Sequence, residues 1–252
     1  MTTITDIYRY PVKGLTPERL ERVRLAAGEA LPFDRAYALA LADSAFDESA
    51  PGWVPKTNFL MLQRDEALAA LHARFDDANL TLRVTGPGGF LVEGRLDEEE
   101  GCEVLAEAIG RYMGLTEGAA PRLVHAEGHT ISDHPEAVVS IIHSASVAAL
   151  ADAVGAEIDP LRFRGNLYIE GGAAWEEFGW VGKTIEIGDA RLEVTQRIPR
   201  CAATGVNPAT AVRDMNLVKA LTEYFGHYDM GVYARVVAHG TVAVGDRLEI
   251  PS

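Results

Sequence analysis

Short β-prone segments separated by glycines constrain the fold of this chain more than any other feature of its sequence. β-prone or alternating apolar residues occupy 4–10, 37–41, 80–84 and 90–92, and alternation is the period of a half-buried strand. The chain has 24 glycines, and Gly86-Pro87-Gly88-Gly89 predicts the turn of a β-hairpin. Many short strands with turn residues between them are typical of an antiparallel or mixed barrel with a few helices.

Helical spacing of apolar residues is less frequent. It predicts helices at 64–75, 97–113, 146–154 and 216–225. Further strands are expected at 122–125, 138–142, 166–170, 184–187, 191–197, 231–238 and 241–250, and the last two should form a hairpin around His239-Gly240. We therefore expect an α+β fold that is mainly β.

A stretch rich in glycine and alanine, 114–121, is the best candidate for a domain boundary. It divides the chain into a predicted N-terminal β-rich domain, 1–118, and a C-terminal domain, 119–252. We found neither an internal repeat nor a low-complexity segment.

The charge of the chain excludes several classes of partner. The formal net charge is −14 among 252 residues, so a nucleic acid or an anionic membrane would be repelled. No apolar run is long enough to span a membrane, and the N-terminus does not resemble a secretory signal, so a cytoplasmic protein is expected. If a small anion binds here, clustered Lys and Arg residues must overcome the overall negative field.

The chain has only two cysteines, which excludes a disulfide framework and an ordinary iron–sulfur cluster. Cys102 lies among carboxylates and aligns with Leu105 and Ile109 at helical spacing, which indicates a buried, inert thiol. Cys201 instead has Arg200 beside it and two alanines after it. Positive neighbours favour a thiolate and small neighbours admit a ligand, although the same context also suits a buried structural cysteine.

Motifs along nearly the whole chain resemble one family. RFRGN (162–166), W-x4-W (175–180), VGKTIEIGDARLEV-x5-RC-x4-VNP (181–208) and GTVAVGDRLEI (240–250) are similar to the MOSC domain, the C-terminal domain of molybdenum cofactor sulfurases. Upstream, YRYPVKG (8–14), DRAYAL (34–39) and PKTNFLML (55–62) resemble the β-barrel domain that precedes MOSC in the amidoxime-reducing branch. The resemblance implies a MOSC β-barrel with flanking helices and a smaller N-terminal β-rich domain.

The same resemblance implies a molybdenum cofactor, Mo-molybdopterin, with Cys201 as the thiolate ligand of the metal. A soft thiolate suits a metal that already carries two pterin sulfurs. Guanidinium groups suit a phosphate, and backbone N–H groups at the start of a helix can meet an anion. The positions that match cofactor contacts of the family are Lys13, Arg35, Ser144, Ala145, Arg164, Asn166, Arg200 and Tyr233.

The activity that the resemblance implies is reduction of N-hydroxylated compounds, such as hydroxylamines, amidoximes or N-hydroxy bases. Because two cysteines cannot hold a cluster, electrons must come from a separate ferredoxin-, flavin- or cytochrome-type reductase. A carrier that delivers the molybdenum cofactor or sulfur without turnover would share all of these residues, so the sequence leaves both hypotheses open.

Two other site hypotheses remain weaker. His125, His129 and His134 lie close together in the sequence with Asp133, but their spacing fits no standard zinc site. A serine hydrolase is disfavoured because no GxSxG motif is present.

Overall fold

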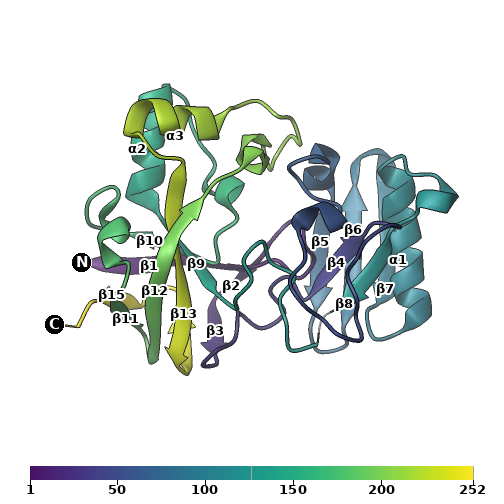
Figure 1. Ribbon diagram of the computed structural model, residues 1–252, viewed down its shortest axis with the longest axis horizontal. Coiled ribbons are helices and arrows are strands. Elements are labelled where there is room, and N and C mark those ends of the chain that lie inside the picture. The colour runs from purple at the N-terminus through teal and green to yellow at the C-terminus, as the bar shows by residue number, and fades with distance from the viewer. Residues whose placement is uncertain (126, 252) are drawn as a thin grey trace.

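The computed structural model describes residues 1–125 and 127–251. They form two lobes that lie side by side (Figure 1). The larger lobe contains both chain ends and most of the strands after residue 138, and the smaller lobe contains most of residues 33–125.

Within the described residues, a closed barrel of seven strands forms the larger lobe. The strands follow one another around the ring in the order β10, β9, β13, β12, β11, β15 and β1, and β1 pairs again with β10. Only β9 and β10 are parallel neighbours. Alternate side chains, among them Ile4, Ile141 and Val194, fill the interior. The ring consists of β1 (Thr2–Arg9), β9 (Val139–His143), β10 (Leu167–Glu170), β11 (Thr184–Ile187), β12 (Ala190–Pro199), β13 (Asp229–Ala238) and β15 (Arg247–Glu249).

The N-terminal segment belongs to this barrel rather than to the smaller lobe. β1 pairs with β10 and β15, and β2 (Glu18–Leu20) pairs with β1. β3 (Arg22–Leu25) pairs with β14 (Gly240–Ala243). The division at residues 118 and 119 stays a prediction. Strands that precede it, β1 and β3, pair with strands that follow it, β10 and β14.

The hairpin predicted around His239-Gly240 is wrong. β13 pairs with β9 and β12, while β14 pairs with β3. The segment predicted as one strand, 241–250, is broken near Gly245, whose φ of +91° lies in the left-handed region that favours glycine. β15 after this break turns back to pair with β1 and β11.

The smaller lobe is built on two short sheets and one helix. The predicted hairpin is confirmed as β6 (Thr81–Gly86) and β7 (Phe90–Arg95), with β5 (His72–Asp76) on the other side of β6. β4 (Tyr37–Ala40) pairs with β8 (Arg122–His125). The apolar face of α1 (Glu99–Tyr112), which includes Leu105 and Ile109, packs into the same core.

The helix predicted over 64–75 is wrong beyond residue 70. The chain forms a short 3-10 helix at Glu66–Ala70 and then strand β5. Leu68, Leu71 and Phe75 are buried as expected, but their spacing fits both structures. The segment becomes a strand rather than a helix because it can pair with the free edge of β6, where Phe75 lies opposite Leu82.

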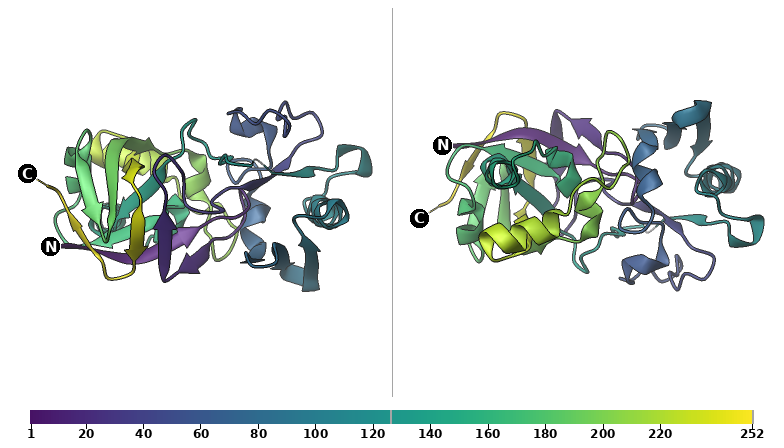
Figure 2. Two further views of the ribbon diagram at one scale, coloured as in Figure 1. Left: turned by 90° about the horizontal axis from the view of Figure 1, so that it is seen from below. Right: turned by 90° about the horizontal axis from the view of Figure 1, so that it is seen from above.

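Two further helices were predicted correctly in type and place. α2 (Ser144–Val154) and α3 (Leu217–Phe225) pack together against the barrel (Figure 2). Each ends at a glycine with positive φ, Gly155 and Gly226. The remaining short 3-10 helices are Lys56–Asn58, Pro87–Gly89, Glu117–Ala119, Pro160–Phe163, Glu176–Trp180 and Ala202–Gly205. Among the residues described, no helix has the length and apolar character needed to cross a membrane.

Candidate functional site

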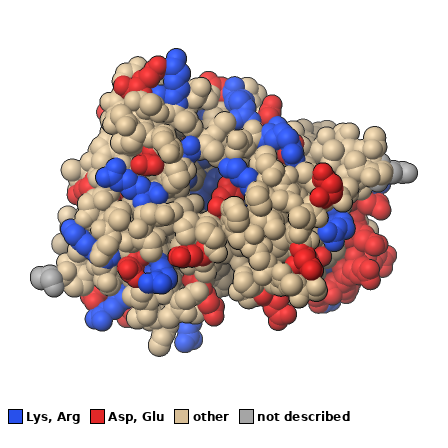
Figure 3. Space-filling view, viewed as in Figure 1, with Lys and Arg blue, Asp and Glu red and all other residues tan. Residues whose placement is uncertain are grey.

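A cavity of about 640 Å³ opens between the two lobes. In the space-filling view, Lys and Arg side chains line a hollow between the lobes, while acidic side chains gather on the smaller lobe (Figure 3). Both halves of the chain contribute to its lining. The N-terminal half provides Lys13, Arg35 and Lys56, and the C-terminal half provides Arg164 and Cys201. A chain with a net charge of −14 has therefore concentrated cations in one cavity.

Most of the residues proposed from the sequence meet there. The expected convergence of Lys13, Arg35 and Arg164 on one pocket is found, although their roles toward a cofactor stay predictions. The proposed residues that line the cavity are Lys13, Arg35, Arg164, Asn166, Arg200, Cys201 and Tyr233.

Ser144 and Ala145, which were also predicted as site residues, do not line this cavity. Ser140 on β9 reaches it, but Ser144 follows the far end of that strand, roughly 13 Å further along the backbone. The N–H of Ala145 already donates to Nδ1 of His143, the N-cap of α2. One of the N–H groups at this helix start is therefore already used within the protein.

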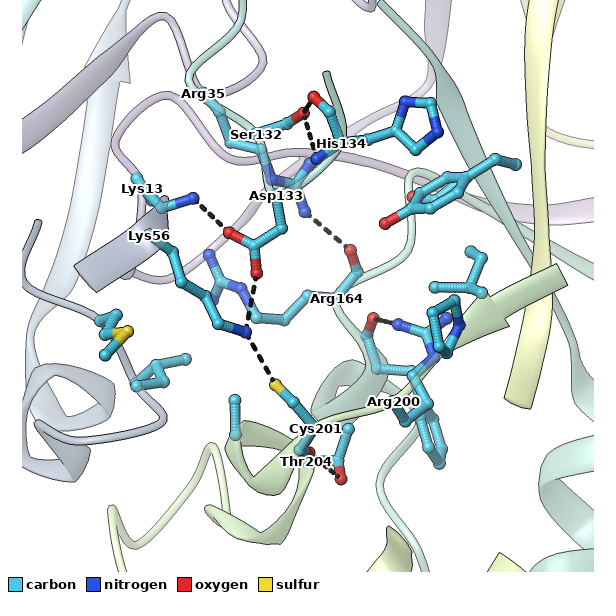
Figure 4. A pocket seen from close by; sticks show the side chains of 18 of the residues that line it. Lys13, Arg35, Lys56, Ser132, Asp133, His134, Arg164, Arg200, Cys201 and Thr204 are labelled. Carbon is cyan, nitrogen blue, oxygen red and sulfur yellow. Dashed lines mark hydrogen bonds and ion pairs between the residues drawn. The ribbon is translucent and has the colours of Figure 1, made fainter. Parts of the chain in front are cut away.

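Cys201 lies where β12 ends. Its backbone carbonyl accepts hydrogen bonds from the N–H and Oγ of Thr204, which begin a 3-10 turn. Its thiol Sγ lies 3.3 Å from Nζ of Lys56 (Figure 4). The backbone is thus held by the turn while the sulfur faces the cavity.

Cys102 lies in a different environment, on α1 in the smaller lobe. Its Sγ is 3.5 Å from the carbonyl oxygen of Leu96, and the side chain packs against the core. Burial, with help from Glu48 and Asp97, raises the pKa of this thiol. The two cysteines therefore differ in surroundings, since Cys102 packs against the core of the smaller lobe and Cys201 lines the cavity.

Two of the arginines that line the cavity, Arg35 and Arg164, lie next to each other. Arg35 forms an ion pair with Asp34 and donates to the carbonyl oxygen of Arg164. Arg164 donates to the carbonyl oxygen of Leu15, and the guanidinium groups of Arg35 and Arg164 lie 4.5 and 4.2 Å from the ring centre of Tyr10. Burial, followed by repulsion from Arg35, lowers the pKa of Arg164 to about 10, so both groups remain charged at neutral pH.

Backbone conformation adds strain at two of these positions. Arg35 and Arg164 have φ of +52° and +51°. A residue with a side chain in that region costs on the order of 1–3 kcal/mol. The strained positions are the two that present neighbouring guanidinium groups to the cavity.

Arg164 and Arg200 have no carboxylate partner within the described part of the chain. Arg200 donates to the carbonyl oxygens of Met230 and Phe163, and burial lowers its pKa. Two partly buried cations that are anchored only by carbonyl oxygens leave a positive charge which an anionic ligand would neutralise.

Asn166 has a structural role that the sequence did not reveal. Its Oδ1 accepts from the N–H and Oγ of Ser140, and its Nδ2 donates to the carbonyl oxygen of Tyr8. The residue is 1% exposed. Its amide therefore ties the start of β10 to β9 and β1, and its contact with a cofactor stays a prediction.

Tyr233 lies on β13 at the side of the cavity. Its ring is tilted against His134, with ring centres 4.9 Å apart. Burial raises its pKa. The phenol is therefore a neutral hydrogen-bonding group at neutral pH.

The structure also reveals two charged residues that the sequence reasoning did not assign. Asp133 forms ion pairs with both Lys13 and Lys56, and Lys56 in turn reaches Cys201 (Figure 4). Lys56 belongs to the PKTNFLML motif, whose position in the sequence was a usable signal. Asp133 had been considered only as a fourth zinc ligand, and no metal-binding group of three or more His, Cys, Asp or Glu occurs in the described residues.

The electrostatics of this chain of charges follow from burial and pairing. Burial lowers the pKa of Lys13, and Asp133 opposes that shift. Burial works to lower the pKa of Lys56, but Asp133 and Cys201 outweigh it and the pKa is raised. Burial works to raise the pKa of Asp133, but Lys13 and Lys56 outweigh it and lower the pKa to about 2.

Replacing Asp133 with Asn should destabilise the protein at neutral pH, and this effect should vanish in acid. Because the folded-state pKa of about 2 lies below the ordinary 3.8, the carboxylate contributes stability above about pH 4. That contribution is lost as the pH falls through about 2. Urea unfolding at several pH values should show the wild type and D133N converging in free energy of unfolding as the pH is lowered. A difference that widened in acid would contradict the ion pairing.

Taken together, these observations define the class of protein: a closed β-barrel beside a cavity that is lined by one of the two cysteines and by a surplus of cations suited to an anionic ligand. Known sequence families agree with this class. The MOSC N-terminal beta barrel domain matches residues 1–129, and the MOSC domain matches residues 128–249. The chain therefore belongs to the family of MOSC proteins that carry this N-terminal domain. MOSC domains are linked in general to the molybdenum cofactor.

Solved structures provide more distant similarities. The YuaD protein from Bacillus subtilis is 13% identical, with 99% of this chain and 96% of that chain covered and a TM-score of 0.46. YiiM from Geobacillus stearothermophilus is 21% identical over 45% of this chain, with a TM-score of 0.37. YiiM from Escherichia coli is 18% identical over 45% of this chain, with a TM-score of 0.34. The match spans 54% of each YiiM chain. Comparison with curated protein sequences returns no match.

Proposed function

We propose that this chain is a molybdenum-cofactor-dependent oxidoreductase that reduces N-hydroxylated compounds with electrons from a separate reductase. The single observation that carries the proposal is the cavity in which Cys201 meets two arginines, Arg164 and Arg200, that no carboxylate neutralises. Membership of the MOSC family supports the cofactor. The motifs YRYPVKG, DRAYAL and PKTNFLML support the amidoxime-reducing branch by resemblance.

The residues present fit such a cofactor. A thiol is the soft ligand that molybdenum with dithiolene sulfurs prefers, and guanidinium groups bind phosphate through charge-assisted hydrogen bonds. The cavity also includes Arg162, whose buried Nε has no hydrogen-bond partner in the described structure. An unused buried donor and unneutralised cations are both explained by an anionic ligand.

Each residue has a distinct part in this proposal. Cys201 would anchor the metal, and Lys13, Arg35 and Arg164 would hold the anionic groups of the pterin and its phosphate. Asn166 would keep the underlying strands in register through its hydrogen bonds to Ser140 and Tyr8. The cofactor, when bound, would supply two-electron redox chemistry at the metal.

The net reaction requires an external source of electrons. An N–OH group takes up two electrons and two protons, the N–O bond breaks, and the products are an N–H group and water. The two cysteines of the chain cannot hold a cluster. A separate reductase would therefore deliver the electrons.

Metal analysis followed by turnover tests the proposal. The purified full-length chain should contain molybdenum and pterin in equal amounts, and it should reduce benzamidoxime when reduced methyl viologen is supplied. A protein that contained the cofactor but did not turn over any N-hydroxylated compound would favour the carrier hypothesis. A protein without affinity for the cofactor would overturn the proposal.

Turnover should also depend strictly on the added donor. With NADH alone the rate should stay at the level of a protein-free control, because we find no flavin- or cluster-binding motif in the sequence. Adding dye or a partner reductase should restore the rate. If the isolated chain oxidised NADH while it reduced the substrate, the proposal of a separate electron donor would be wrong.

A further inference from the structure

Lys56 places a cation within hydrogen-bonding distance of the sulfur of Cys201. It begins a short 3-10 helix in the smaller lobe and extends across the cavity toward the larger lobe (Figure 4). Its Nζ lies 3.3 Å from Sγ of Cys201 and 3.3 Å from Oδ2 of Asp133. The side chain is 28% exposed, so solvent and a ligand can both reach it.

Asp133 is an anion shared between two lysines. One carboxylate oxygen pairs with Lys13 and the other with Lys56. The Asp133 side chain is 48% exposed and belongs to a loop at the edge of the cavity. A single carboxylate thus neutralises only one of the two positive charges that face it.

The two lysines differ in how firmly they are held. Lys13 is 8% exposed and also donates to the carbonyl oxygen of Ile131 at 3.1 Å. Lys56 has only Asp133 and the sulfur of Cys201 as hydrogen-bond partners in the described structure. Lys56 is therefore the member of the pair that can exchange one anion for another without losing a backbone anchor.

We propose that Lys56 is a specificity-determining residue, which makes the space beside Cys201 select anionic ligand groups, and that Asp133 occupies the anion position until such a group displaces it. This inference rests on the proposed function, in which the bound group faces Cys201. To that function it adds Lys56 as the residue that discriminates between ligands by their charge. It also adds Asp133 as the carboxylate that competes with the ligand for Lys56.

The effect of the Lys56 charge on the binding or reaction of an anionic group is large enough to measure. A unit charge about 4 Å away changes the energy of another by about 1 kcal/mol even in water, which corresponds to about a fivefold change in rate or affinity. Salt should reduce the effect, because the Debye length falls to about 3 Å at 1 M ionic strength. Charge discrimination beside Cys201 is therefore large enough to detect with small probes.

Two alkylating reagents of similar size provide the test. Iodoacetate carries a negative charge and iodoacetamide carries none, and both react with the same thiolate. At one pH the ratio of their rates at Cys201 therefore reports local charge and not the fraction of thiolate. All proteins would be full-length and metal-free and carry Cys102→Ser, so that Cys201 is the only thiol.

We expect Lys56→Gln to lower the iodoacetate-to-iodoacetamide ratio about fivefold relative to the parent. Asp133→Asn should change the ratio in the opposite direction, because it removes the competing anion from Lys56. Lys183→Gln, at an exposed lysine outside the cavity, should leave the ratio unchanged. At 1 M NaCl the parent and Lys56→Gln should converge.

An unchanged ratio in Lys56→Gln would overturn the inference. A lower ratio in Asp133→Asn would also overturn it, since Asp133 would then hold Lys56 in place rather than compete with the ligand. The ratio is measured without metal, so a protein that fails to bind molybdenum can still show charge selection. Failure of the proposed function and failure of this inference are therefore distinguishable.

Discussion

Cys201→Ser should lose its molybdenum and at least about a hundredfold of its turnover while keeping its fold. Changes in residues that merely support a metal ligand cost 10–100-fold, and this substitution replaces a soft thiolate ligand with a hard, poorly ionised hydroxyl. The structure makes the fold tolerant of the change. The backbone of Cys201 is held by Thr204 through the carbonyl oxygen, not through the side chain.

Cys102→Ser is the matched control for this prediction. Its partly buried thiol packs against the core of the smaller lobe and contacts the carbonyl oxygen of Leu96. We expect full metal content and a stability loss on the order of 1 kcal/mol. Molybdenum, pterin and turnover would be measured side by side on both variants. Full activity in Cys201→Ser, or loss of metal in Cys102→Ser, would refute the assignment of the ligand.

Arg164→Ala should weaken retention of the pterin by roughly ten- to a hundredfold. A hydrogen bond to a charged group contributes about 1.5–3 kcal/mol, and each 1.4 kcal/mol is a factor of ten. Arg164 has no carboxylate partner in the described structure and shares the ring of Tyr10 with Arg35. Its charge is therefore free for a ligand.

Arg164 also supports the fold through its bond to the carbonyl oxygen of Leu15, so a second variant is needed. Arg164→Lys keeps the charge but loses the planar fork, and we expect an intermediate loss of pterin. Pterin content after extensive dialysis, together with thermal unfolding of the metal-free proteins, separates the two effects. Unchanged pterin retention in Arg164→Ala would exclude this residue from the cofactor site.

Local sequence patterns predicted those elements whose hydrogen bonds form between near neighbours. The hairpin of β6 and β7 followed from alternation around a glycine-rich turn, and the three α-helices followed from apolar spacing. The difference between Cys102 and Cys201 was also visible, because the charges that distinguish them lie within a few residues in the chain. Resemblance to MOSC motifs then indicated which scattered cations belong with Cys201.

Long-range pairing could not be deduced from the sequence. Segment 72–76 is a strand because the edge of β6 is available for pairing. β14 pairs with β3, which lies more than two hundred residues earlier in the chain, and not with β13. The contact between Lys56 and Cys201 joins positions 145 residues apart. Periodicity reports which face of a segment is apolar, but the choice of partner depends on the free energy of the whole assembled fold.

The sequence by itself therefore determined the class of fold, the order of its parts and which of the two cysteines lines the cavity. Only the tertiary structure decided that β1 closes the C-terminal barrel, that Ser144 and Ala145 lie outside the cavity, and that the amide of Asn166 is used internally. The reason is physical. Composition and spacing act over a few residues, whereas a cavity and its electrostatic field arise only when distant segments are packed against one another.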